Sequence, residues 1–156
     1  MSVSPKLREQ LEVEFEQLRL LLQRHPGLME KYQTETPSNL ELDAMATILH
    51  AFYTGIENLF KRLHLEIDGA FPQGEAWHIK LLDAMASTTP FRPAVISPEL
   101  RQNLRGFLDF RHVFRHAYTH ELKWTKMKAL VLTAKSTLQR LEEETNRFFA
   151  LMNKEQ

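Results

Sequence analysis

The chain has 156 residues, and its 20 basic and 20 acidic side chains leave no formal net charge at neutral pH. The absence of cysteine excludes disulfide bonds and thiolate metal sites, and no apolar run approaches the ~20 residues that span a bilayer. We expect one domain over residues 1–156, located in the cytoplasm and without membrane contact, because the N-terminus also has no signal-peptide pattern.

Two long helices are predicted in the first half of the chain. Ser4-Pro5 is a helix start signal, an N-cap followed by proline at the first helical position, and the apolar periodicity after it ends before Pro26-Gly27. The segment Thr36-Pro37-Ser38 opens a second helix, which we expect Gly69 to close. The predicted apolar faces of the two helices consist of Leu7, Leu11, Phe15, Leu18 and Leu22, and of Leu42, Met45, Ile48, Phe52, Ile56, Leu59, Phe60 and Leu63.

Three further helices are predicted in the second half. A short helix covers about residues 75–86 and is followed by a loop, 87–93, that its two prolines extend. Ser97-Pro98 starts a fourth helix, a break is expected within 118–121, and a final helix runs from about residue 123 to residue 152. The predicted fold class is therefore all-α, an antiparallel bundle of about five helices.

The residues that carry chemistry lie near the end of the fourth helix. Arg111, His116 and Tyr118 form an R-x4-H-x-Y pattern. Arginine is a permanently charged fork that binds phosphate, and histidine transfers protons near neutral pH. Residues 101–128 around the pattern carry seven basic and two acidic side chains. A charge run of this kind is as often a solvated helix face, but its coincidence with the pattern favours a phosphate-binding surface.

This set of residues suits the cleavage of RNA without a metal ion. The 2′-hydroxyl attacks the adjacent phosphate when one group removes its proton, another protonates the leaving 5′ oxygen, and a cation stabilises the phosphorane. We therefore predict Arg111 and His116 as catalytic residues. His112 and Arg115 are candidates for supporting or RNA-binding residues, and the competing interpretation of each, as a surface residue that the reaction does not require, is the commoner one. On an ideal helix the side chains of Arg111 and His116 diverge by about 140°, so they converge only if the helix bends or the site is shared.

The histidines also allow a metal-binding alternative. His112, His116 and His120 follow one another at four-residue intervals, and two histidines at this spacing can bind zinc. No H-E-x-x-H pattern accompanies them, and cysteine ligands are absent. We therefore expect neither a metal nor another cofactor.

The R-x4-H-x-Y pattern resembles the signature of HEPN-domain ribonuclease toxins of the HepT type. The similarity extends from about residue 40 to the end, through residues 51–57, residues 74–78 with Leu81-Leu82, and the Arg92-Pro93 turn. The resemblance implies a HEPN-like bundle that forms a symmetric homodimer with a composite active site. It also implies an endoribonuclease that leaves a 2′,3′-cyclic phosphate and has a minimal nucleotidyltransferase antitoxin as its partner.

The resemblance assigns roles to two more residues. Tyr118 matches the tyrosine to which the antitoxin attaches AMP, whose charge would then lie where substrate phosphate binds; alternatively, its hydroxyl anchors the helix end. Glu57 matches a position where the family often has an acidic or polar residue that orients the catalytic groups. It is either buried against Arg111 or exposed beside Asn58 and Lys61.

Other functions compete with the ribonuclease toxin. One is a HEPN-like helical module that binds a nucleotide or a protein without nuclease activity, and another is an unrelated helical adaptor. The presence of Arg111, His116 and Tyr118 together favours the toxin, because a binding module does not need all three. Trp77-His78 is interpreted as a packing aromatic beside a histidine at the rim of the bundle.

Overall fold

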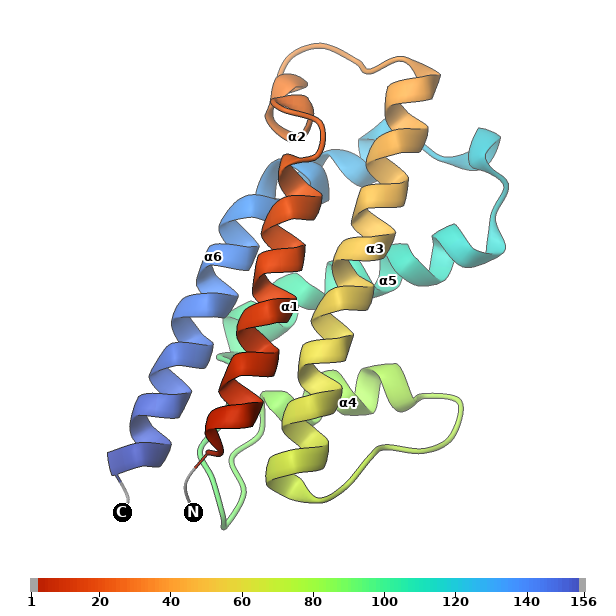
Figure 1. Cartoon of the computed structure of the whole chain (residues 1–156). Helices are drawn as coiled ribbons and strands as arrows, with labels where there is room; N and C mark the ends of the chain where they lie inside the picture. Colours follow the sequence, from red (N-terminus) through yellow and green to blue (C-terminus); the bar gives the residue numbers. More distant parts are fainter. Residues whose placement is uncertain (1–2, 155–156) are drawn as a thin grey trace.

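The computed structural model describes residues 3–154 and confirms the all-α class: within this range it contains six α-helices and no β-strand (Figure 1). A π-helical turn, η1, continues the third α-helix, and a 3-10 turn, η2, precedes the last. None of the helices in residues 3–154 combines the length and the apolar character needed to cross a membrane. The elements are α1 (Pro5–Gln23), α2 (Leu28–Lys31), α3 (Asn39–Leu63), η1 (His64–Asp68), α4 (Trp77–Met85), α5 (Pro98–His116), η2 (Thr119–Glu121) and α6 (Trp124–Lys154).

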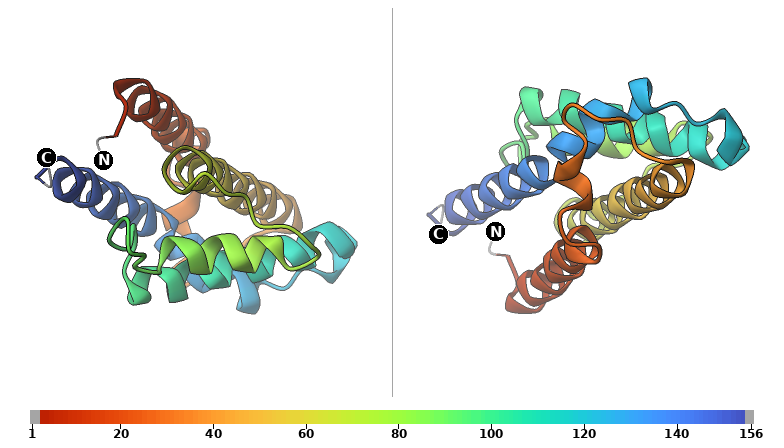
Figure 2. Two further views of the ribbon diagram at one scale, coloured as in Figure 1. Left: turned by 90° about the horizontal axis from the view of Figure 1, so that it is seen from below. Right: turned by 90° about the horizontal axis from the view of Figure 1, so that it is seen from above.

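The helices form three layers around α3. Helices α3 and α6 lie in the middle, α1 covers one side, and α4 and α5 cover the other (Figures 1 and 2). Helix α1 runs antiparallel to α3 and α6, whereas α3 and α6 run in the same direction. Helices α4 and α5 lie between α3 and α6 in the sequence. Helix α5 crosses the long helices instead of lying alongside them. Only part of the bundle is therefore antiparallel.

The predicted start signals are the observed helix starts. Ser4, Ser38 and Ser97 are N-caps whose hydroxyls accept hydrogen bonds from backbone N–H groups three residues on. Helix α2 was not predicted, because four residues are too few to show a helical period. It follows Gly27, whose φ of 77° lies in the left-handed region that glycine adopts readily.

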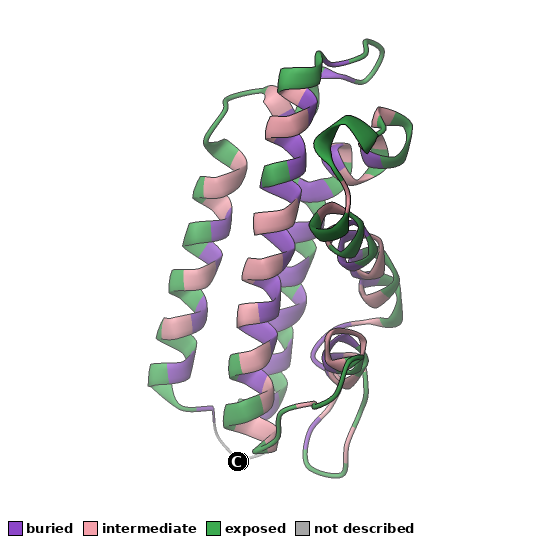
Figure 3. Cartoon of the chain, turned by 90° about the vertical axis from the view of Figure 1, so that its right-hand side faces the viewer, coloured by how far each residue is buried: buried purple, intermediate pink, exposed green. Residues whose placement is uncertain are grey.

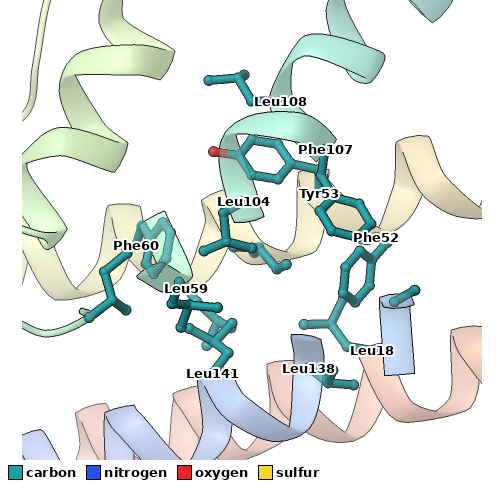
Figure 4. Close-up of a cluster of buried hydrophobic side chains, with 14 of the residues drawn as sticks. Leu18, Phe52, Tyr53, Leu59, Phe60, Leu104, Phe107, Leu108, Leu138 and Leu141 are labelled. Carbon is teal, nitrogen blue, oxygen red and sulfur yellow. The ribbon is translucent and has the colours of Figure 1, made fainter. Parts of the chain in front are cut away.

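The core is centred on α3, which buries side chains toward α1, α5 and α6. Figure 3 shows the buried faces of the long helices turned toward one another, and Figure 4 shows aromatic rings filling the space between α3 and α5. Phe52 and Phe107 pack edge to face with ring centroids 5.2 Å apart. This packing fixes the second half of α5 against α3, and so positions the residues of the R-x4-H-x-Y pattern.

A buried ion pair closes the lower end of α3. The Asp68 carboxylate, at the end of η1, accepts hydrogen bonds from Nε (2.6 Å) and Nη2 (2.8 Å) of Arg92. The His64 ring lies 2.7 Å from the same carboxylate. The Arg92 guanidinium also donates to the backbone carbonyls of Ala84, Ser87 and Pro93, and its side chain is 2% exposed. This Asp68–Arg92 clamp holds the loop between α4 and α5 against the end of α3.

Candidate functional site

An open groove of about 500 Å³ lies where the start of α4 packs beside the second half of α5. Helix α5 contributes Arg111, His112, Arg115 and His116 to its wall, and α4 contributes His78. Four predicted site residues thus line one groove within a single chain. Arg111 and His116 reach it although α5 is unbroken from Pro98 to His116, because the groove extends along several turns of the helix.

Arg111 is held from behind by α3. Its side chain is 13% exposed, its Nε donates to the Thr54 hydroxyl at 3.2 Å, and its Nη1 lies 3.6 Å from Oε1 of Glu57. Glu57 is 2% exposed. The sequence left two alternatives for Glu57, burial against Arg111 or exposure beside Asn58 and Lys61. The structure has the buried carboxylate, so the prediction of an exposed one is wrong. A buried carboxylate that faces an arginine restricts the guanidinium to one edge of the groove.

His78 is the residue that sequence reasoning missed. Its Nδ1 lies 2.5 Å from Oε2 of Glu57, so the buried carboxylate has a histidine partner as well as an arginine. The ring stacks on Trp77 with centroids 3.6 Å apart. The interpretation of His78 as a rim histidine is therefore incomplete, because it leaves out the pairing with Glu57. A separation of 21 residues between Glu57 and His78 leaves no local pattern that pairs them.

His112 and His116 are both exposed, one helical turn apart, with ring centroids separated by 4.7 Å. His120 stacks instead on Tyr118, at 5.5 Å. Within residues 3–154, no three histidine, aspartate or glutamate side chains are grouped so that they could hold a metal ion. The three histidines at four-residue spacing therefore do not form a common ligand set in the described chain.

Tyr118 lies just beyond the end of α5 and outside the residues that line the groove. Its side chain is 73% exposed, and the turn that follows is capped by the Glu121 carboxylate, which accepts from the Tyr118 backbone N–H at 3.4 Å. The ring is thus in solvent rather than packed beneath the helix end. Tyr118 lies two residues from His116 in the sequence.

Arg111 and Arg115 place positive charge at the groove. His50, on α3, is half-buried against Phe114, and burial lowers the pKa of its ring. The positive charges of Arg111 and Arg115 lower the same pKa further. Asp109 offsets part of this charge through its ion pair with Arg105 at 2.9 Å. Glu57 faces the Arg111 guanidinium at 3.6 Å and offsets part of its charge, whereas Arg115 is exposed on the groove wall, where it can contact an anion such as phosphate.

These features define a class of protein: a small helical bundle with an arginine–histidine groove supported by a buried carboxylate. The sequence profile of a family described as "HepT-like protein" matches residues 44–152, more than half of the chain. The chain belongs to the HepT-like family. No match was found among curated proteins or among solved structures. The matched segment includes every predicted site residue, from Glu57 to Tyr118.

Proposed function

We propose that this chain is the toxin of a toxin–antitoxin pair and acts as a metal-independent endoribonuclease in the cytoplasm. The observation that carries the proposal is the groove of α4 and α5, where Arg111 and His116 of a HepT-like chain lie together. Membership of the family supports the toxin role. The geometry supports nuclease chemistry, because a fixed guanidinium and a solvent-accessible imidazole line one open groove.

In the proposed reaction the RNA 2′-hydroxyl attacks the adjacent phosphorus, and the bond to the 5′ oxygen breaks. Arg111 binds the non-bridging oxygens as negative charge develops on them, and His116 transfers a proton. Arg115 and His112, both exposed along the groove, bind neighbouring parts of the RNA. The products are a 2′,3′-cyclic phosphate and a free 5′-hydroxyl. A symmetric homodimer would place two such grooves in one composite site.

The expected result of the direct test is that purified wild type cleaves a total-RNA pool in EDTA and leaves cyclic phosphate ends. His116→Ala should be at least about 100-fold slower, because proton transfer is lost. His25→Ala is the matched control, since His25 is exposed between α1 and α2, outside the groove. Absence of cleavage by unmodified wild type would favour the alternative, a HEPN-like module that binds a nucleotide or protein.

Regulation is proposed to act through Tyr118. A nucleotidyltransferase antitoxin would attach AMP to its exposed hydroxyl, placing a phosphodiester charge beside His116 and repelling RNA. Incubation with a cognate nucleotidyltransferase and ATP should increase the mass of the chain by about 329 Da for each AMP attached. The modified chain should no longer cleave RNA.

Tyr118→Phe should retain cleavage and resist this inactivation. Mass spectrometry of the intact chain and of its peptides measures the modification. Transfer of AMP to another residue, with the same inhibition in Tyr118→Phe, would contradict the assignment.

A further inference from the structure

The His78 ring is held in one orientation by two neighbours, Glu57 and Trp77. Its Nδ1 is 2.5 Å from the Glu57 carboxylate, which is 2% exposed, and Trp77 covers one ring face at 3.6 Å. Lys61 lies 4.7 Å over the Trp77 ring. The second oxygen of Glu57 faces Arg111 at 3.6 Å. One buried carboxylate therefore couples the orientation of His78 to that of the phosphate-binding arginine.

This arrangement also selects a tautomer. An ionised carboxylate only accepts hydrogen bonds, so Nδ1 of His78 carries the proton that it donates to Glu57. In the neutral ring, Nε2 then has a free lone pair. Because the two nitrogens flank Cε1 on opposite sides, Nε2 points away from Glu57, and His78 lines the groove. The same carboxylate–histidine logic orients the general base in serine proteases.

We propose that His78 is the general base that removes the 2′-hydroxyl proton, that Glu57 is its positioning residue, and that His116 is the general acid. This inference rests on the ribonuclease function proposed above and identifies the second proton-transfer group that the reaction needs. The 2′ oxygen forms a bond to phosphorus as its proton moves to Nε2 of His78. The bond from phosphorus to the 5′ oxygen breaks as His116 supplies a proton to that oxygen. Exchange with water then restores both rings.

His112 is the other histidine of the groove, and it is less suited to be the base. Its ring is exposed and contacts His116, and no carboxylate is paired with it among the described residues. A base with no orienting partner spends less time in the reactive geometry. Glu57 from α3 pairs with His78, and the charged or titratable residues that line the groove with it are Glu75 ahead of α4 and, from α5, Arg105, Asp109, Arg111, His112, Arg115 and His116.

The test compares two RNA substrates of one sequence. The first is ordinary RNA, and in the second a sulfur atom replaces the leaving 5′ oxygen at one bond. A thiolate leaves without protonation, so the second substrate needs a base but no acid. His78→Ala should be at least about 100-fold slower on both substrates. His116→Ala should be slow on ordinary RNA and approach the wild-type rate on the sulfur substrate.

The dependence of kcat/KM on pH supplies a second readout. The limb that rises with pH should disappear in His78→Ala while the falling limb, assigned to His116, remains. Glu57→Gln should reduce kcat, because an amide that donates to Nδ1 reverses the tautomer. In the double variant with His78→Ala the added loss should be smaller than the loss in wild type, because the part that acts through His78 is already gone and only the contact of Glu57 with Arg111 is still affected. A variant that merely misfolds would lose both limbs together with its cooperative unfolding transition.

The outcomes separate this inference from the function on which it rests. Wild-type rates for His78→Ala, with His116→Ala inactive, would overturn the role of His78 and leave the ribonuclease intact. Rescue of His78→Ala by the sulfur substrate would make His78 the acid and overturn its assignment as base. Absence of cleavage of either substrate by unmodified wild type would overturn the proposed function itself, and this inference with it.

Discussion

Replacing Arg111 by alanine is expected to lower the rate of RNA cleavage by about 1,000-fold or more. The guanidinium is the groove's fixed cation, held by Thr54 at 3.2 Å and facing Glu57 at 3.6 Å. It needs no reorganisation when charge develops on the phosphorane, and removing a preorganised group of this kind costs about 10²–10³ in rate, or more for an arginine on a transferring phosphate. Single-turnover cleavage of a labelled oligoribonucleotide measures the effect on the chemical step.

Arg111→Lys should recover only part of this loss. An ammonium keeps the charge but lacks the planar fork that contacts two phosphate oxygens at once. Arg147→Ala is the matched control, because Arg147 is exposed on α6 and lies outside the groove. Cleavage by Arg111→Ala within about tenfold of wild type, with the helical content unchanged, would mean that phosphate is stabilised by another residue.

Arg92→Ala is expected to lower the free energy of unfolding by about 3–5 kcal/mol, the loss typical of breaking a buried ion pair. The guanidinium donates to Asp68 and to three backbone carbonyls; its removal leaves the carbonyls without this donor and the Asp68 carboxylate with only the His64 ring beside it. Urea unfolding followed by circular dichroism measures the change. Arg101→Ala is the control: its pair with Asp83 is partly exposed and should contribute less than about 1 kcal/mol. A similar loss in both variants would contradict a special role for the clamp.

The same clamp predicts a dependence of stability on pH. Burial raises the pKa of Asp68, but hydrogen bonds from Arg92 and His64 outweigh it, and the net result is a lowered pKa. The folded state therefore binds this proton less readily than the unfolded state. Stability from Asp68 is present above its unfolded pKa of about 3.9 and is lost as the pH falls through the lower folded value. Wild type should lose more stability on acidification than Arg92→Ala, because the variant lacks the main group that lowers this pKa.

The pattern of the sequence predicted much of the fold because its signals are local. A serine followed by proline caps a helix through bonds to its own next turn, so Ser4 and Ser97 mark helix starts wherever the rest of the chain lies. Apolar residues at three- and four-residue spacing likewise report a helix that is buried along one face. The short α2 and the direction of α5 across the bundle gave no such signal, because they depend on packing against other helices.

The residues of the candidate site also fall into two groups, those predicted from local sequence and those found only in the tertiary structure. Arg111, His116 and Tyr118 are recognisable from the sequence by itself, because their spacing along the chain is a pattern within eight residues. Only the tertiary structure decided that Glu57 is buried and that its two oxygens face Arg111 and His78. Three helices meet at this carboxylate, and the burial that makes its pairing necessary exists only once they have packed. The sequence determined which chemistry the chain carries, whereas the packing of α3, α4 and α5 decided which groups hold it in place.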